Sequence, residues 1–284
     1  MKKNLIALAL AVSAVSGVAH AWTDGEFSGS VDFGGSITPD TEVQNWAWEA
    51  GTGLNNFSSY ISDMTSGGTV LKITAEDNKA ILLGKTKKTI AGNVGSGIIP
   101  QLSFSDGAGN TVTINRNESN QKSGEVYFIL PVTDGDSGSA LGNLRVNAAV
   151  AGVVLGVTTS KTSSNLFSAA GTDSNTSNAF FGGIPSGSAI QSAKTAVSLT
   201  EMFGALSESD LTEQVSLTYP DAVGTINYLT SSAATSFVGS VNPASAATYA
   251  MGIKSGQTMD VVFDSEVTDE VNWVAPLNIS VSYY

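Results

Sequence analysis

The sequence predicts an all-β fold, a sandwich of short strands. Runs rich in Val, Ile, Leu, Thr and aromatic residues recur between breaks of Gly, Asn, Asp and Ser. In several runs apolar and polar residues alternate, as in a strand with one buried face. We expect ten strands, at 43–48, 69–74, 79–83, 111–116, 125–132, 144–157, 223–229, 246–253, 259–263 and 271–284.

The chain starts with a secretory signal peptide, which we assign to residues 1–21. Two lysines precede an apolar stretch at 5–18, and Ala19-His20-Ala21 provides a cleavage site of the A-x-A type. The apolar stretch is shorter than the roughly 20 residues that a membrane-spanning helix requires. We therefore expect an exported mature chain that begins at Trp22.

The composition excludes several classes of function. Cleavage removes His20, the only histidine, and the chain contains no Cys. Ser-His-Asp and Cys-His catalysis, His/Cys zinc sites, His- or Cys-ligated haem and disulfides are thereby excluded. A formal charge of −12 with only 13 Lys and Arg argues against nucleic acid as a partner. We expect no enzyme and no cofactor.

Two segments that suggest chemistry are better interpreted as turns. The segment 135–139, Gly-Asp-Ser-Gly-Ser, is similar to the nucleophile segment of trypsin-like proteases, but Ser137 has no histidine base in the mature chain. The four carboxylates within 264–270 lack the D-x-D-x-D-G register of a calcium loop. No spacing supports a two-carboxylate glycosidase.

The segment 22–40 is predicted to be extended, because twelve of its residues alternate strictly. It is either an ordinary first strand or a detachable arm, since it lies at a free end and precedes Pro39-Asp40. Sixteen extended residues reach about 50 Å, enough to enter a neighbouring molecule. The residues of one parity are Phe27, Gly29, Val31, Phe33, Gly35 and Ile37.

Two later runs predict how their strands are buried. The run 111–116 has apolar residues at alternate positions, so one of its faces should be buried and the other solvated. The run 79–84 is apolar at every position between Lys79 and Gly84. It should be a central strand that is buried on both faces.

The middle of the chain interrupts the strand pattern. Residues 159–188 are rich in Ser, Thr, Asn and Gly, and two capping motifs, Ser198-x-x-Glu201 and Ser207-x-x-Asp210, follow. They predict short helices beginning near Leu199 and Glu208. We interpret 159–217 as an insertion, and loops of this length are usually functional. The residues expected to pack the helices onto the sandwich are Met202, Phe203, Leu206 and Leu211.

The chain ends in the middle of a predicted strand. Leu277, Ile279, Val281 and Tyr283 alternate with polar residues up to the last residue, Tyr284. A final strand with no following hairpin partner leaves an open edge, and open edges recruit other strands.

Several segments together resemble those of a known family. They are the start Met1-Lys2-Lys3-Asn4-Leu5-Ile6, the arm Gly25-x-Phe27-x-Gly29-Ser30-Val31-Asp32-x-Gly34-Gly35-Ser36-Ile37-Thr38, the pair Trp46-x-Trp48 with Gly51-Thr52-Gly53-Leu54-Asn55, the run Asn78-Lys79-x-Ile81-Leu82-Leu83-Gly84, and the ending Trp273-x-Ala275-Pro276-Leu277-Asn278-Ile279 with Tyr283-Tyr284. In these segments the chain resembles FaeG-type major fimbrial subunits of enterotoxigenic Escherichia coli. The resemblance is weakest between 159 and 242.

The resemblance implies a chaperone-usher pilin, an incomplete immunoglobulin-like β-sandwich that lacks its last strand and spans 41–284. A PapD-like periplasmic chaperone lends a strand to the open groove and holds the terminal carboxylate, here that of Tyr284. At the outer-membrane usher the arm of the next copy replaces that strand, which builds a homopolymeric fimbria on the cell surface. The arm residues named above would fill the groove, and Leu277, Ile279, Val281, Tyr283 and Tyr284 would line it and its chaperone edge.

The resemblance also implies adhesion to a host glycoprotein or glycolipid through the insertion. Sugar sites favour an exposed aromatic face with amide or carboxylate groups nearby, and Asn178, Phe180 and Phe181 form one such candidate cluster. Alternatively, both Phe residues anchor the insertion to the core. The alternative function is a surface-coat or capsule-like fimbrial subunit without lectin activity.

Overall fold

The structure, a computed structural model, describes residues 45–55, 57–92, 98–235, 237 and 242–283. The chain divides into two units between Asp40 and Thr41, and every described residue belongs to the second. The predicted signal peptide and arm therefore lie outside the described residues. The strands are β1 (Trp46–Ala50), β2 (Val70–Thr74), β3 (Lys79–Thr86), β4 (Ile90–Ala91), β5 (Pro100–Ser105), β6 (Asn115–Arg116), β7 (Glu125–Asp134), β8 (Ala140–Val157), β9 (Ser164–Ser168), β10 (Ile226–Tyr228), β11 (Ala244–Ile253), β12 (Thr258–Phe263), β13 (Trp273–Val274) and β14 (Asn278–Tyr283).

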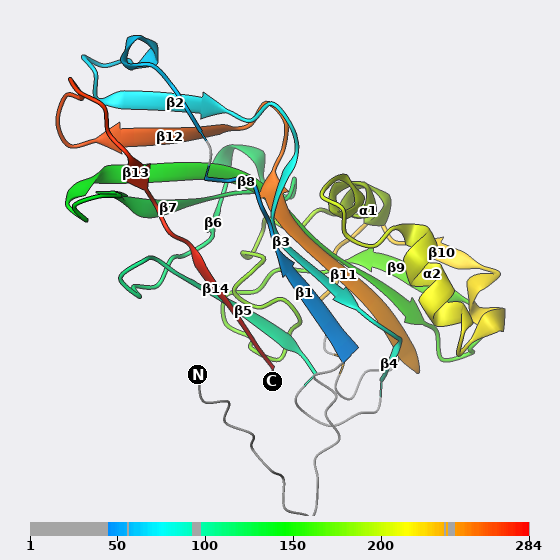
Figure 1. The fold of residues 1–284 in the computed structure, drawn as a ribbon. Helices are drawn as coiled ribbons and strands as arrows, with labels where there is room; N and C mark the ends of the chain where they lie inside the picture. Colours follow the sequence, from blue (N-terminus) through cyan, green and yellow to red (C-terminus); the bar gives the residue numbers. More distant parts are fainter. Residues whose placement is uncertain (1–44, 56, 93–97, 236, 238–241, 284) are drawn as a thin grey trace, which may run out of the picture. The chain divides into compact units, whose positions relative to one another are not determined.

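The all-β prediction is confirmed, with two α-helices as a small addition. The helices are α1 (Ala193–Met202) and α2 (Glu208–Ser216), and 3₁₀ turns occur at Ile61–Asp63, Glu118–Asn120 and Pro220–Val223. Among the described residues, twelve strands join one sheet, and β14 pairs with β5 in a second. The two sheets form the sandwich (Figure 1).

The long strand β8 organises the large sheet because its two halves have different neighbours. Residues 140–149 pair with β7 on one side and, over 142–146, with β12 on the other. The second half pairs with β11 and β9. The strand β3 lies between β1 and β11, so it is central, as its unbroken apolar run predicted.

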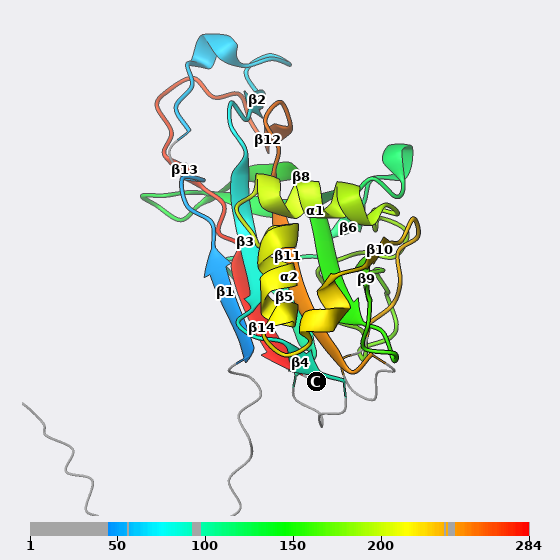
Figure 2. The ribbon, with the colours of Figure 1, turned by 90° about the vertical axis from the view of Figure 1, so that its right-hand side faces the viewer.

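The two faces of β8 pack against different layers. Even-numbered residues such as Ala148 and Val150 belong to the sandwich core, which lies between the two sheets. Odd-numbered residues such as Ala149 and Val153 belong to a second core, the helical core, under α1 and α2. Figure 2 shows both helices lying across this face of the sheet. The part of the large sheet formed by the second half of β8 and by β11 is therefore buried on both faces.

The helices are held by apolar residues at helical spacing and by serine caps. Leu211 and Val215 of α2 are fully buried, and Ser207 caps this helix at the predicted position. The prediction for α1 was wrong, because Ser192 caps it and Ser198 lies inside it. Phe203, Leu206 and Leu211 pack on the sheet as expected, whereas Met202 is 44% exposed.

Several strand boundaries differ from the prediction. The run 111–116 contributes only β6, although Val112 and Ile114 are buried as its alternation predicted. The run 271–284 is split at 275–277 into β13 and β14, because Pro276 has no N–H for a ladder. Strands β4, β5 and β9 were missed, and β9 lies within the segment interpreted as an insertion.

Candidate functional site

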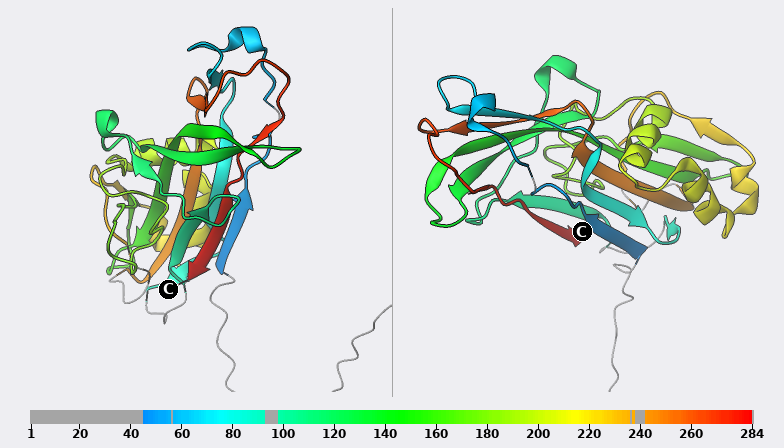
Figure 3. Two further views of the ribbon diagram at one scale, coloured as in Figure 1. Left: turned by 90° about the vertical axis from the view of Figure 1, so that its left-hand side faces the viewer. Right: turned by 45° about the horizontal axis from the view of Figure 1, so that its top comes forward.

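Two strands with a single paired neighbour among the described residues, β1 and β14, lie at one opening of the sandwich. Among the described residues, β1 pairs through its backbone with β3, and β14 pairs with β5. Neither strand has a second backbone-paired neighbour in this part of the chain. Figure 3 shows the two strands beside each other, running in opposite directions. Each therefore presents one row of unpaired N–H and C=O groups toward the other edge.

The side chains of β14 alternate as the sequence predicted. Ile279, Val281 and Tyr283 are half-buried and pack against the sandwich core, while Asn278, Ser280 and Ser282 are exposed. Leu277, directly before the strand, is also half-buried. Half-burial of an apolar row is the expected state of a core that lacks its last covering strand.

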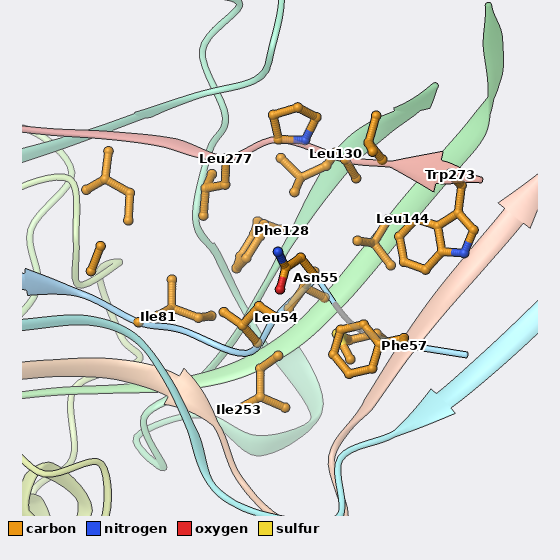
Figure 4. A pocket seen from close by; sticks show the side chains of 18 of the residues that line it. Leu54, Asn55, Phe57, Ile81, Phe128, Leu130, Leu144, Ile253, Trp273 and Leu277 are labelled. Atoms are coloured by element: carbon orange, nitrogen blue, oxygen red, sulfur yellow. The ribbon is translucent and has the colours of Figure 1, made fainter. Parts of the chain in front are cut away.

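A cavity of about 490 Å³ lies where β1 ends and β14 begins, with residues of 50–55 and Phe57 on one side and residues 271–277 and Ile279 on the other. Its floor is apolar and comes from five strands of the large sheet (Figure 4). The residues are Ile81 from β3, Phe128 and Leu130 from β7, Leu144 and Val146 from β8, Ile253 from β11 and Met259 from β12. Leu277 and Ile279 close one side, and Ala50 at the end of β1 closes the other. None of the residues that line it is charged. The cavity is therefore suited to apolar side chains.

One hydrogen bond joins the two edges at the other end of the groove. The Nε1–H of Trp48 on β1 donates to the Oη of Tyr283 on β14 over 3.0 Å. Burial raises the pKa of the Tyr283 phenol above its usual value, while the hydrogen bond from Trp48 acts in the opposite direction. Trp48 stacks on Trp46, with 5.8 Å between ring centroids. The sequence pattern Trp-x-Trp gave no indication of this contact across the groove.

The structure places the candidate acceptor residues in two groups. Leu277 and Ile279 line the cavity, and Val281 and Tyr283 lie beyond it, toward Trp48. Tyr284 and the donor residues Phe27, Gly29, Val31, Phe33, Gly35 and Ile37 lie outside the described residues.

The glycan candidates do not form an exposed cluster. Phe180 is 1% exposed and Asn178 is 8% exposed, so neither side chain is available to a sugar ring. Phe180 packs edge-on against Trp46 and lies 5.2 Å from the Tyr249 ring centroid. Exposure was therefore wrong for these two residues, and Phe180 follows the alternative in which it anchors the insertion to the core. Phe181 is half-buried, and its carbonyl accepts from the Leu102 N–H over 2.8 Å.

A group of one aromatic and two charged side chains, Tyr228, Lys194 and Glu208, lies beside the helices. Tyr228 on β10 is 39% exposed, and the Nζ of Lys194 on α1 lies 4.3 Å from its ring centroid. The Tyr228 hydroxyl donates to a Glu208 carboxylate oxygen, a bond that raises the pKa of Tyr228. Sequence reasoning missed this cluster because its three residues are far apart in the chain.

Two other kinds of site are missing from the described ranges. No helix there is long and apolar enough to cross a bilayer, and no three His, Cys, Asp or Glu side chains there are grouped as metal ligands. The turn 135–139 lies between β7 and β8, where the Asp134 carboxylate accepts from the Asp136 and Ser137 N–H groups. These bonds from Ser137 and Asp136 lower the pKa of Asp134.

Comparison with known proteins decides the family. A family model described as "Fimbrial, major and minor subunit" matches residues 1–284. The chain belongs to this family of fimbrial subunits. It is 41% identical to K88 fimbrial protein AC and 40% identical to K88 fimbrial protein AB of Escherichia coli, over the full length of each chain. It is also 28% identical to the F41 fimbrial protein of E. coli over the full length of both.

Family membership settles the broad role of the chain. A fimbrial subunit is a structural protein that polymerises with other subunits on the cell surface, and it is not an enzyme.

Proposed function

We propose that this chain is the major subunit of a chaperone-usher fimbria and that its groove receives the arm of the next copy by donor-strand exchange. The observation that carries the proposal is the uncharged cavity at the end of β1 and the start of β14, beside two strands that each have one paired neighbour among the described residues. The same chain contains, at 22–40, a segment with alternating apolar residues, which lies outside the described residues. The apolar residues of the groove are half-buried and can be covered by one more strand, and the segment 22–40 has the alternating pattern of a strand.

The energetics favour this pairing. Phe27, Val31, Phe33 and Ile37 would contribute roughly 1.5 to 3 kcal/mol each on full burial, or about 6 to 12 kcal/mol before ordering costs. Backbone hydrogen bonds along β1 and β14 would add to this. Before polymerisation, a PapD-like periplasmic chaperone would cover the groove and hold the carboxylate of Tyr284, and an outer-membrane usher would direct the exchange.

The test compares the mature chain from Trp22 with a chain that begins at Val43, each coexpressed with the chaperone and analysed on an unboiled gel. We expect multimers from the first and only monomer from the second. Phe33→Asp should also remove the multimers, because it places a charge in an apolar cavity. Ser30→Asp, at the opposite parity, is the matched control. Identical monomers from both chains would overturn the proposal.

We also propose that the fimbria adheres to a host glycoprotein or glycolipid. The exposed Tyr228 ring, with Lys194 and Glu208 beside it, has the aromatic face and charged flanks that sugar sites use. Tyr228→Ala should remove glycan binding and leave the multimers in place. Binding that survives Tyr228→Ala would exclude this cluster. If intact fimbriae bind no glycan on a broad array, the alternative of a surface-coat subunit without lectin activity gains.

A further inference from the structure

A second pocket adjoins the groove at the end where β14 begins. It has a volume of about 220 Å³ and shares Phe57 and the segment 271–273 with the first cavity. Tyr60 and Ile61 line it, and these side chains are 79% and 46% exposed. Exposed apolar side chains that gather at a pocket mark a contact with another molecule. The position beside the groove points to the molecule whose arm the groove receives.

Four carboxylates lie at or near this second pocket. Asp269 and Glu270 line it, and Asp264 and Glu266 precede them in the exposed loop between β12 and β13. Among the described residues, no lysine or arginine forms an ion pair with any of the four. Negative charge is therefore concentrated at this end of the sandwich, where it favours a cationic partner surface.

Two exposed lysines lie at the other end of the sandwich. Ala50 lines the first cavity at one end of β1, and Trp46 at the other end pairs with Thr86 of β3. Lys87 and Lys88 follow Thr86 directly and are exposed. No described carboxylate forms an ion pair with either lysine. Figure 1 shows the turn after β3 and the loop between β12 and β13 at opposite ends of the sandwich.

These lysines lie close to the residue at which the described chain follows the arm. The Lys87 N–H donates to the Asn45 carbonyl over 2.7 Å. The arm ends at Asp40, and the five residues from there to Asn45 span at most about 17 Å. The two lysines of an incoming copy therefore come close to the end of the groove at which its arm leaves.

The direction of the arm decides which end of the groove that is. β14 pairs antiparallel with β5, and the strands of such a sandwich pair antiparallel in general. An arm that pairs in this way with β14 has its last residues beside the first residues of β14 and the segment 271–277. The lysines of the incoming copy then face the carboxylates of the copy that receives its arm.

We propose that the second pocket and the carboxylates of 264–270 dock the Lys87–Lys88 end of the next copy, a charged contact that accompanies donor-strand exchange. This inference rests on the proposed exchange and adds the surface that orients the two copies. Each copy uses a different end toward each neighbour, so the contact is heterologous and repeats along a filament without closing. Complementary charges of this kind raise the rate of association and select the orientation of the partner.

The experiment mixes purified complexes of the full mature chain with its chaperone and follows the initial rate of multimer formation on unboiled gels. At about 10 mM salt, Lys87→Glu with Lys88→Glu should be at least about fivefold slower than the parent, because like charges then meet. At about 1 M salt the two rates should agree within about twofold, because the screening length falls from about 30 Å to about 3 Å. Lys122→Glu, at an exposed lysine before β7, is the control and should change the rate less than about twofold at either salt concentration.

A mixture of variants tests whether the two ends meet. Asp269→Lys with Glu270→Lys should slow multimer formation at low salt by a similar factor, although it changes the net charge in the opposite direction. Mixed in equal amounts, the two slow variants should reach about half the parental rate, because half of their encounters join opposite charges. Equal low-salt rates for the parent and both variants, or a mixture as slow as its components, would overturn the docking surface. If the parent forms no multimers at either salt concentration, donor-strand exchange itself is wrong.

Discussion

Gly84 shows how one missing side chain shapes the groove. A Cβ atom at this position would lie 2.2 Å from a ring carbon of Trp48, and side-chain contacts this close do not occur without movement. Gly84→Ala should therefore destabilise the fold by about 1 to 3 kcal/mol through overpacking. Urea unfolding of the mature chain measures the change.

Gly224 supplies the matched control. Its φ is negative, and a Cβ there would meet only the Asp221 carbonyl oxygen at 3.8 Å. Gly224→Ala should change the free energy of unfolding by less than about 0.5 kcal/mol. Equal effects of the two alanines would show that the indole of Trp48 can move freely.

The buried Tyr249 should make the stability of the fold depend on pH. Its side chain is fully buried, its hydroxyl donates to the Gly183 carbonyl over 3.1 Å, and burial raises its pKa far above the usual value of 10.0. The folded chain keeps this proton at a pH at which the unfolded chain loses it. The unfolded state then binds fewer protons, so stability should fall as pH rises above about 10.

Tyr249→Phe tests this linkage. At pH 7 it should cost about 0.5 to 1.5 kcal/mol, because the Gly183 carbonyl loses its donor. Between pH 10 and 12 its stability should fall less steeply than that of the parent chain. Tyr60→Phe, at a residue that is 79% exposed, is the control. The same alkaline slope in Tyr249→Phe and the parent would contradict the assignment.

At the scale of elements, the same capping motif occurs at Ser207 and Ser198, but only Ser207 caps a helix. Ser207 caps α2, where its hydroxyl oxygen accepts from the Asp210 N–H and the Asp210 carboxylate accepts from the Ser207 N–H. The bonds from Ser207 lower the pKa of Asp210. Ser207→Ala should cost about 1 kcal/mol of stability.

Ser198 has the same sequence motif but lies exposed inside α1. Ser198→Ala should be neutral or slightly stabilising, because alanine is the better helix former. Thermal unfolding of the two variants decides the point. A loss of stability in Ser198→Ala equal to that in Ser207→Ala would mean that α1 begins near Leu199 after all.

These two serines also show which parts of an element its sequence determines. A capping motif requires a hydroxyl three residues before a carboxylate, and both segments meet this condition. The start of α1 was decided instead by burial of Ala193 and Ala196 against the sheet, which is a tertiary contact. The same limit applies to β9 and β5, whose short runs become strands through β8 and β14.

The candidate groove was predictable on one side only. The alternation at 277–283 predicted which side chains face the core, and the structure has this pattern. The cavity floor comes from β3, β7, β8, β11 and β12, and Trp48 reaches Tyr283 over 235 positions of sequence. Phe180 was misassigned because local polarity suggested exposure, although its partners Trp46 and Tyr249 are distant in sequence.

At the scale of the molecule, two cores share one sheet but differ in how they are closed. The helical core is covered by α1 and α2 from the same chain. The sandwich core is covered along β14 only by half-buried side chains, and a cavity remains beside them. We therefore expect a strand that fills the groove to stabilise this molecule.

A peptide of residues 22–40, added to a chain that begins at Val43, should therefore stabilise that chain. A ligand that binds only the folded state adds RT ln(1 + [L]/Kd), or about 2.7 kcal/mol at a hundredfold excess over Kd. Thermal unfolding should show a midpoint that rises with peptide concentration, because the peptide buries the half-exposed row on β14. The same peptide with Phe33→Asp should give no rise, since its carboxylate would enter a cavity that lacks any charged partner. A midpoint that rises equally with both peptides would mean that binding occurs outside the groove.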